Sequence, residues 1–276
     1  GMGSASLRKV PVDPALRINV GLLSKMIADD RAAGLRPICV IGTAGTVNSG
    51  AIDDLDAIAD LCAKEYLWFH VDGAFGALAA FAPSLKPLVA GMERADSLAF
   101  DLHKWGYLPY EIACVLVKDR AIHEGAFSVT PSYLTDEGRG VIAGGLPFAD
   151  RGIELTRGFK ALKVWLSFKA QGVDAIANVI EQNVAQARAF ADRVVRLPDA
   201  VLSAPVSLNI VCFRFAPAAM APDAQDAFNK EILLRVQESG LAIVSGSRMG
   251  GRYVIRVACS NHRSRWEDFE QLAEGV

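Results

Sequence analysis

Several features that mark common protein classes are missing from this sequence. Its five cysteines are widely spaced and contain no CxxC pair, which argues against a zinc site and a disulfide framework. No uninterrupted apolar stretch approaches the roughly 18 residues that a membrane helix needs. No GxGxxG motif follows a strand-like run, which argues against a dinucleotide-binding dehydrogenase. The first residues, GMGSASLRKV, lack the apolar segment of a secretory signal.

A run of charge of one sign is also missing. The formal net charge is -2, and acidic and basic residues are interspersed along the chain. Nothing therefore directs the protein toward nucleic acid. We expect a cytoplasmic protein with reduced, buried thiols that binds neither nucleic acid nor membrane.

What is present is the composition of a globular protein with an α/β fold. The chain has 276 residues, of which 51% are hydrophobic and 22% charged. This is long enough for one large core or two smaller ones. Short apolar runs alternate with amphipathic stretches, which is typical of a mostly parallel sheet. The predicted strands are Pro37–Gly42, Tyr66–Val71, Asp96–Asp101 and Cys114–Val117, with a helix over Asp53–Glu65.

The second half of the chain predicts a long loop and then a small α+β domain. The loop covers Ser128–Gly152, and a helical region over Leu155–Leu197 follows it, broken near Gly172. We expect residues 1–162 to belong to a large domain, and residues 163–276 to form a linking helix and the small domain. The elements predicted for the latter are a strand over Leu208–Phe215, a helix over Ala224–Ser239, short strands over Leu241–Val244 and Tyr253–Val257, and a helix from Trp266.

Lys104 is the first candidate for chemistry. It follows the third predicted strand and lies between His103 and Trp105. A lone lysine commonly lies on a solvated surface. In this position, however, desolvation would lower the pKa of its amine and make it nucleophilic, as the reaction of an amine with an aldehyde requires.

Asp72 is the second candidate, because it ends the strand run YLWFHV. It could simply cap the turn after the strand. Alternatively, it is a buried carboxylate waiting for a cation, such as the protonated pyridine nitrogen of pyridoxal phosphate. The small residues Gly73, Ala74 and Gly76 would let a flat ring approach the backbone. In α/β sheets ligands collect at the carboxyl ends of strands, where Thr43, Asp72 and Lys104 are all expected.

Longer segments extend this pattern. In chain order they are PICVIGTAGTVNSGAIDDL, WFHVDGAFGA, ADSLAFDLHKWGYLPYE, TPSYL, ELTRGFKALKVW and VIRVACSNHR. They resemble successive motifs of the group II amino acid decarboxylases that depend on pyridoxal 5'-phosphate. The resemblance implies the aspartate-aminotransferase fold, decarboxylation of an L-amino acid to its amine, and a homodimer.

The same resemblance implies roles for individual residues around the cofactor. Lys104 matches the lysine that binds the cofactor as a Schiff base, and Asp72 matches the carboxylate paired with the pyridine nitrogen. Ala74 matches a small residue packed behind the ring. Thr43 matches a threonine near the ring hydroxyl.

Four further positions match residues outside the ring plane. His103 and Asp101 match positions on the phosphate and lysine side of the cofactor, although a carboxylate there would repel phosphate unless it is screened. Tyr133, in the TPSYL segment, matches a loop tyrosine that protonates the substrate carbon. Arg157 matches an arginine that helps to bind a carboxylate in some members.

Other readings remain open at this point. The resemblance begins after the family's Ser/Gly-rich phosphate segment and its ring-stacking histidine. We therefore expect a fragment or a truncated relative, which by itself would bind pyridoxal phosphate weakly or not at all. Transamination or lyase chemistry on the same fold is one alternative. A non-catalytic subunit that lacks the phosphate-binding segment is the other.

Overall fold

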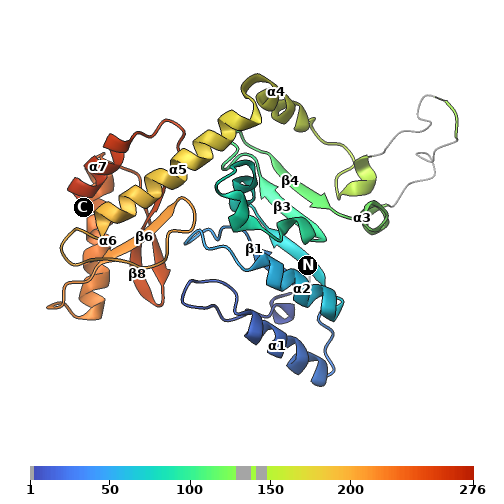
Figure 1. The fold of residues 1–276 in the computed structure, drawn as a ribbon, viewed down its shortest axis with the longest axis horizontal. Coiled ribbons are helices and arrows are strands. Elements are labelled where there is room, and N and C mark those ends of the chain that lie inside the picture. The colour runs from blue at the N-terminus through green and yellow to red at the C-terminus, as the bar shows by residue number, and fades with distance from the viewer. Residues whose placement is uncertain (1–2, 129–137, 141–147) are drawn as a thin grey trace.

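The computed structural model describes residues 3–128, 138–140 and 148–276. Within them lie two four-stranded sheets, and the long helix α5 (Val173–Val194) runs from one to the other (Figure 1). The first sheet is mostly parallel and the second is antiparallel. The predicted α/β class with a small C-terminal α+β unit is confirmed.

The first sheet has the order β1-β2-β3-β4. Strands β1 to β3 are parallel, and β4 is antiparallel to β3. The edge strands leave apolar side chains half exposed, namely Ile41 at 50%, Val115 at 52% and Leu116 at 54%. The strands are β1 (Cys39–Thr43), β2 (Trp68–Asp72), β3 (Ser97–Asp101) and β4 (Ala113–Val117).

Three helices accompany these strands, one before β1, one between β1 and β2 and one after β4, and their first turns are capped by side chains. The carboxamide of Asn19 and the carboxylates of Asp54 and Asp119 each accept a backbone N–H three residues further on. Such caps satisfy amides that the helix itself leaves free. The helices concerned are α1 (Val20–Ala32), α2 (Leu55–Glu65) and α3 (Arg120–Phe127). The short 3-10 helices are η1 (Ser4–Ser6), η2 (Gly76–Phe81), η3 (Lys86–Val89), η4 (Met92–Arg94) and η6 (Phe148–Arg151).

The second sheet has the order β5-β6-β8-β7 and carries its own helices. The helix α4 (Ala161–Gln171) precedes α5, and Gly172 lies between them with a φ of 81°. The predicted break near Gly172 is confirmed. The remaining elements are β5 (Ala200–Leu202), β6 (Ile210–Phe215), α6 (Pro222–Glu238), β7 (Ser245–Met249), β8 (Arg252–Ala258) and α7 (Trp266–Gly275).

Each sheet packs in its own hydrophobic core, and α5 contributes to both. Its N-terminal half packs into the first core and its C-terminal half into the second. Among the described residues, no helix is both long and apolar enough to cross a bilayer. The α5 side chains are Ile176, Ala177, Ile180 and Val184 in the first core, and Ala187, Phe190, Ala191 and Val194 in the second.

Two expectations about local structure are wrong. Leu241–Val244 is not a strand; the strand begins at Ser245 and pairs with β8 in a hairpin. Gly250 and Gly251 form the turn of that hairpin, with φ values of 55° and 78°.

The second error concerns the thiols. Cys62, Cys212 and Cys259 are buried as expected, but Cys39 is exposed and Cys114 is only half-buried. Cys39 lies in β1 and Cys114 in β4, the two edge strands of the first sheet. Each of these strands has a neighbour on only one side, which leaves part of its surface open.

Candidate active site

The ends of three strands bring most of the predicted site residues together. Thr43 and Asp72 are paired in the register of β1 and β2, and Asp72 is paired with Ala99 of β3. Beyond the strands, the backbone N–H of Asp101 donates to the carbonyl of Ala74 at 3.1 Å. Thr43, Asp72, Ala74 and Asp101 therefore lie at one edge of the sheet, where Thr43 and Asp72 were expected from the sequence together with Lys104.

Asp72 is exposed at the end of β2. Its Oδ1 accepts the backbone N–H of Ala74 at 3.0 Å, so the side chain does cap the turn. No described residue hydrogen-bonds to its Oδ2. The turn-capping and functional interpretations are therefore compatible, because one oxygen holds the turn and the other is free for a ligand. The expectation that this carboxylate is buried is wrong for the chain described here.

Lys104 lies in the turn that follows β3. Its Nζ is 2.6 Å from Oδ2 of Asp101, and its side chain is 40% exposed. The prediction that this amine is desolvated is therefore wrong for the described chain, because the amine forms a half-exposed ion pair. The turn points the lysine back toward the strand end, since Asp101 is the last residue of β3.

His103 packs on the other side of the same carboxylate. Its Nε2 is 3.9 Å from Oδ2 of Asp101, and its Nδ1 lies against the backbone N–H and carbonyl of Ile112. Its ring contacts the ring of Tyr110 at a centroid distance of 4.6 Å. The amine of Lys104 and the imidazole of His103 thus lie near the same oxygen of Asp101, and the lysine offsets its negative charge.

Asp53 is a buried carboxylate that sequence reasoning missed. It accepts the backbone N–H of Thr43 at 2.8 Å and that of Ile18 at 2.7 Å. Burial raises the pKa of this carboxyl, while the two backbone donors act in the opposite direction. Asp53 fixes the end of β1 and hence the backbone of Thr43. The only sequence signal was its place just before α2, which was interpreted as a helix N-terminus.

Trp105 and Asn183 form a second feature that the sequence did not reveal. The ring of Trp105 stacks on Phe75 at 4.8 Å, and its Nε1 donates to Oδ1 of Asn183 at 3.0 Å. Phe75 comes three residues after Asp72, and Trp105 directly follows Lys104. The tryptophan therefore joins the two segments that carry the candidate residues.

The glycines beside Asp72 have a different purpose from the predicted one. A Cβ on Gly73 would lie 2.6 Å from the Cβ of Ala77, and one on Gly76 would lie 2.4 Å from the carbonyl oxygen of Ala44. Both are therefore needed for packing within the chain. The expectation that they leave room for a flat ring is not supported.

One predicted residue is not part of this group, and another is not described by the structure. Arg157 lies between η6 and α4, where its guanidinium hydrogen-bonds the carbonyl of Phe148. None of its hydrogen bonds or ion pairs within the described chain reaches the strand-end residues. Tyr133 lies outside the described residues.

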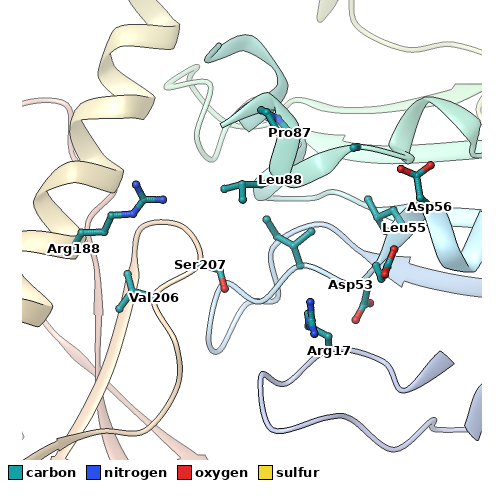
Figure 2. A pocket seen from close by; sticks show the side chains of 12 residues that line it. Arg17, Asp53, Leu55, Asp56, Pro87, Leu88, Arg188, Val206 and Ser207 are labelled. Atoms are coloured by element: carbon teal, nitrogen blue, oxygen red, sulfur yellow. The ribbon is translucent and has the colours of Figure 1, made fainter. Parts of the chain in front are cut away.

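An open pocket of about 500 Å³ is lined by side chains from the start of α2 and the residues before it, from η3 and from α5 (Figure 2). Figure 2 shows Arg188, from α5, and Ser207 on one side and Arg17, Asp53 and Leu88 on the other. Its lining includes none of the seven predicted site residues that the structure describes. Asp53 is shared between the pocket and the backbone of Thr43.

Comparison with known protein families gives one consistent answer. Residues 2–216 match the model of the pyridoxal-dependent decarboxylase conserved domain. The chain is 37% identical over 265 residues to the aromatic-L-amino-acid decarboxylase of Bacillus atrophaeus, covering 96% of this chain and 55% of that protein. It is 30% identical to the enzyme of the same name from Sus scrofa, covering 99% of this chain and 56% of that one.

Solved structures agree with this result. The structure of Oryza sativa TDC with PLP and tryptamine matches with a TM-score of 0.91 at 28% identity, over 99% of this chain and 56% of that one. Mouse CSAD in its apo form matches with a TM-score of 0.90 at 26% identity, over 99% of this chain and 58% of that one. The chain spans about half the length of the curated relatives that it matches.

Proposed function

Because the chain belongs to the pyridoxal-dependent decarboxylase family, we propose that the protein decarboxylates an L-amino acid to its amine and carbon dioxide with pyridoxal 5'-phosphate. The observation that carries the proposal is the grouping of Lys104, Asp101 and Asp72 at one edge of the parallel strands. Relatives named for aromatic amino acids, tryptophan and histidine support an aromatic L-amino acid as the substrate.

The chemistry of these side chains fits the cofactor. The free Oδ2 of Asp72 is the acceptor that a protonated pyridine nitrogen needs, and Lys104 supplies an amine for the aldehyde. Ala74 comes two residues after Asp72, and its side chain is only a methyl group. It therefore adds no polar atom that would compete with Asp72 or Lys104 for the cofactor. The phosphate would be held near His103, and the ion pair of Asp101 with Lys104 reduces the repulsion expected from that carboxylate.

When bound, the cofactor supplies a sink for the electron pair left on the substrate Cα as carbon dioxide departs. Asp72 keeps a positive charge on the ring nitrogen, which strengthens that sink. Asp101 holds the amine of Lys104 while the amine is not bonded to the cofactor, and His103 holds Asp101. We propose that Tyr133 delivers a proton to the substrate Cα and that Arg157 binds a substrate carboxylate.

We also propose a homodimer in the cytoplasm. The resemblance to the decarboxylase family supports the dimer. Five free cysteines, with no disulfide among them, support a reducing compartment.

Replacement of the lysine tests the proposed function directly. The intact protein, with any segments that precede or follow this chain, should show a visible absorption band with added pyridoxal phosphate and release carbon dioxide from L-tryptophan, L-tyrosine or L-histidine. Lys104→Ala should abolish the band and lower carbon dioxide release by about a thousandfold or more. Lys25→Ala is the matched control, because Lys25 is an exposed lysine whose ion pair with Asp29 lies on α1. An unchanged band or an unchanged rate in Lys104→Ala would contradict the assignment.

A further inference from the structure

The turn that carries Lys104 is held in a fixed conformation. The backbone N–H of Tyr107 donates to the carbonyl of Lys104 at 3.3 Å, and that of Leu108 donates to the carbonyl of Leu102 at 3.2 Å. Tyr107 has a φ of 57°, a left-handed conformation that non-glycine residues adopt only when their surroundings impose it. The contacts of the turn therefore decide where the lysine points.

Trp105 supplies the first of these contacts. Its side chain is fully buried and stacks on Phe75, in the segment that begins with Asp72. Its only polar atom, Nε1, points the other way and donates to Oδ1 of Asn183 in α5. A buried indole N–H that loses its acceptor is costly, so this hydrogen bond limits how far the turn can move.

Asn183 binds both flanks of the turn through one oxygen. Besides the indole of Trp105, its Oδ1 accepts the hydroxyl of Tyr107. Its Nδ2 faces the opposite way, 3.4 Å from the carbonyl of Asn261 and 3.5 Å from Oε1 of Gln186. The whole Asn183 residue is 0% exposed, and its acceptor and donor ends are both used.

The contacts on the donor side lead to the segment after β8, directly through Asn261 and indirectly through Gln186 of α5. Asn261 follows β8, and Gln186 donates to the carbonyl of Ser264 at 2.8 Å. The ring of His262 packs edge-on against Tyr107 at 5.2 Å. A single carboxamide therefore joins the lysine-bearing turn, the helix that runs between the two cores, and the segment after β8.

We propose that Asn183 is a positioning residue for Lys104. By fixing Trp105 and Tyr107, it holds the turn that sets the position of the lysine amine relative to Asp101 and Asp72. The value of this positioning for catalysis rests on the proposed function, whereas the positioning itself is a property of the chain alone.

The test measures how readily the lysine amine reacts in protein without cofactor. The protein is treated with a limiting amount of an acylating reagent, and mass spectrometry gives the ratio of labelling at Lys104 to labelling at Lys25. Asn183→Leu removes the acceptor, and Trp105→Phe removes the indole donor. Asn229→Leu is the matched control, because Asn229 is an equally buried asparagine whose hydrogen bonds lie within the C-terminal unit.

Asn183→Leu should raise the Lys104 to Lys25 ratio by about threefold or more, because an amine freed from its fixed ion pair meets the reagent more often. Asn229→Leu should leave the ratio unchanged even though it also removes a buried amide. Combining Trp105→Phe with Asn183→Leu should give no further rise over Asn183→Leu alone, since that variant already removes the acceptor of the indole N–H. An unchanged labelling ratio in Asn183→Leu would overturn the proposal. So would a double variant whose rise in the ratio equals the product of the rises in the two single variants.

Two further measurements make the test decisive. If Asn183→Leu fails to fold, Trp105→Phe alone must raise the ratio by about twofold, and no rise would overturn the proposal. With cofactor bound, Asn183→Leu should lower kcat for decarboxylation more than it changes KM. If Lys104→Ala leaves decarboxylation intact, the proposed function fails, while the labelling ratio still decides the role of Asn183.

Discussion

At the scale of single residues, the ion pair between Lys104 and Asp101 must open before the amine can react. The side chain of Lys104 is 40% exposed and that of Asp101 is 19% exposed, so water can reach the pair. Exposed ion pairs contribute about 0–1 kcal/mol. Asp101 can therefore hold the amine in place without preventing its reaction with an aldehyde.

The buried thiols give a second prediction at this scale. Burial raises the pKa of Cys62 and of Cys259 to about 12, and that of Cys212 to about 11. A free thiol has a pKa of about 8.5, so at neutral pH the thiolate fraction of Cys62 and Cys259 is lower by roughly three orders of magnitude. N-ethylmaleimide should therefore label the exposed Cys39 first, as followed by mass spectrometry of peptides.

Unfolded protein in concentrated urea is the control for the labelling experiment. All five cysteines should then react at similar rates, because burial no longer separates them. Labelling of Cys259 in the folded protein as fast as that of Cys39 would contradict the predicted order.

At the scale of secondary-structure elements, the segment after β2 packs closely against the end of β1. The backbone N–H of Gly76 donates to the carbonyl of Ala44 at 3.0 Å, and that of Ala44 donates to the carbonyl of Asp72 at 2.8 Å. This pair of hydrogen bonds ties the start of η2 to both strand ends. The position of Asp72 therefore depends on a close approach of two backbones.

A methyl group at position 76 should disturb this contact. The added Cβ of Gly76→Ala would lie 2.4 Å from the carbonyl oxygen of Ala44, so the free energy of unfolding should fall by about 1–3 kcal/mol. Gly125→Ala is the matched control, because no atom lies within 4 Å of a Cβ there. It should change stability by less than about 1 kcal/mol, in the stabilising direction. Urea unfolding of both variants checks this, and equal midpoints would contradict it.

The sequence predicted the elements that hold the candidate site, but not all the others. The ends of β1, β2 and β3 were predicted because continuous apolar runs stop at polar or small residues. The helix α1 was not predicted, because only two of its residues, Leu23 and Ile27, are buried and it therefore has little periodicity. The strand β7 was not predicted, and a strand was expected instead at the apolar residues Leu241–Val244 just before it, because β7 itself has no apolar run and pairs with β8.

At the scale of the whole molecule, α5 makes the two cores depend on each other. Ile180 and Phe190 of this helix are fully buried, the first in one core and the second in the other. The boundary that we propose between a large and a small domain, at residues 162 and 163, lies in α4 just ahead of it. A change in either core is therefore transmitted along one rigid helix.

Removing a side chain from α5 should reveal this dependence. Phe190→Ala should lower the free energy of unfolding by about 3–5 kcal/mol, because it leaves a cavity in the second core. Side chains of α5 also lie in the first core. Hydrogen exchange of backbone amides in β2 and in β8 reports the urea midpoint of each core, and the two midpoints should shift together. A shift for β8 alone, with β2 unchanged, would show that the cores unfold separately.

The packing of the whole molecule explains why sequence analysis did not find every part of the site. Lys104 and Asp72 were found because each follows a strand and lies in a recognisable motif. Asn183 was not found, because it lies 78 residues from Trp105 and only the packing of α5 brings the two together. The exposure of Asp72 and Lys104 also could not be predicted, because it depends on which surfaces pack over the strand ends.

The shared helix limits how the chain can be divided for expression as separate pieces. A fragment that stops before Val173 loses four aliphatic side chains from its interior, and one that starts after Val194 loses four others. A cut inside the helix leaves both pieces short of interior side chains. Complementation should therefore succeed only when two overlapping fragments, each with a full copy of residues 173–194, are produced together.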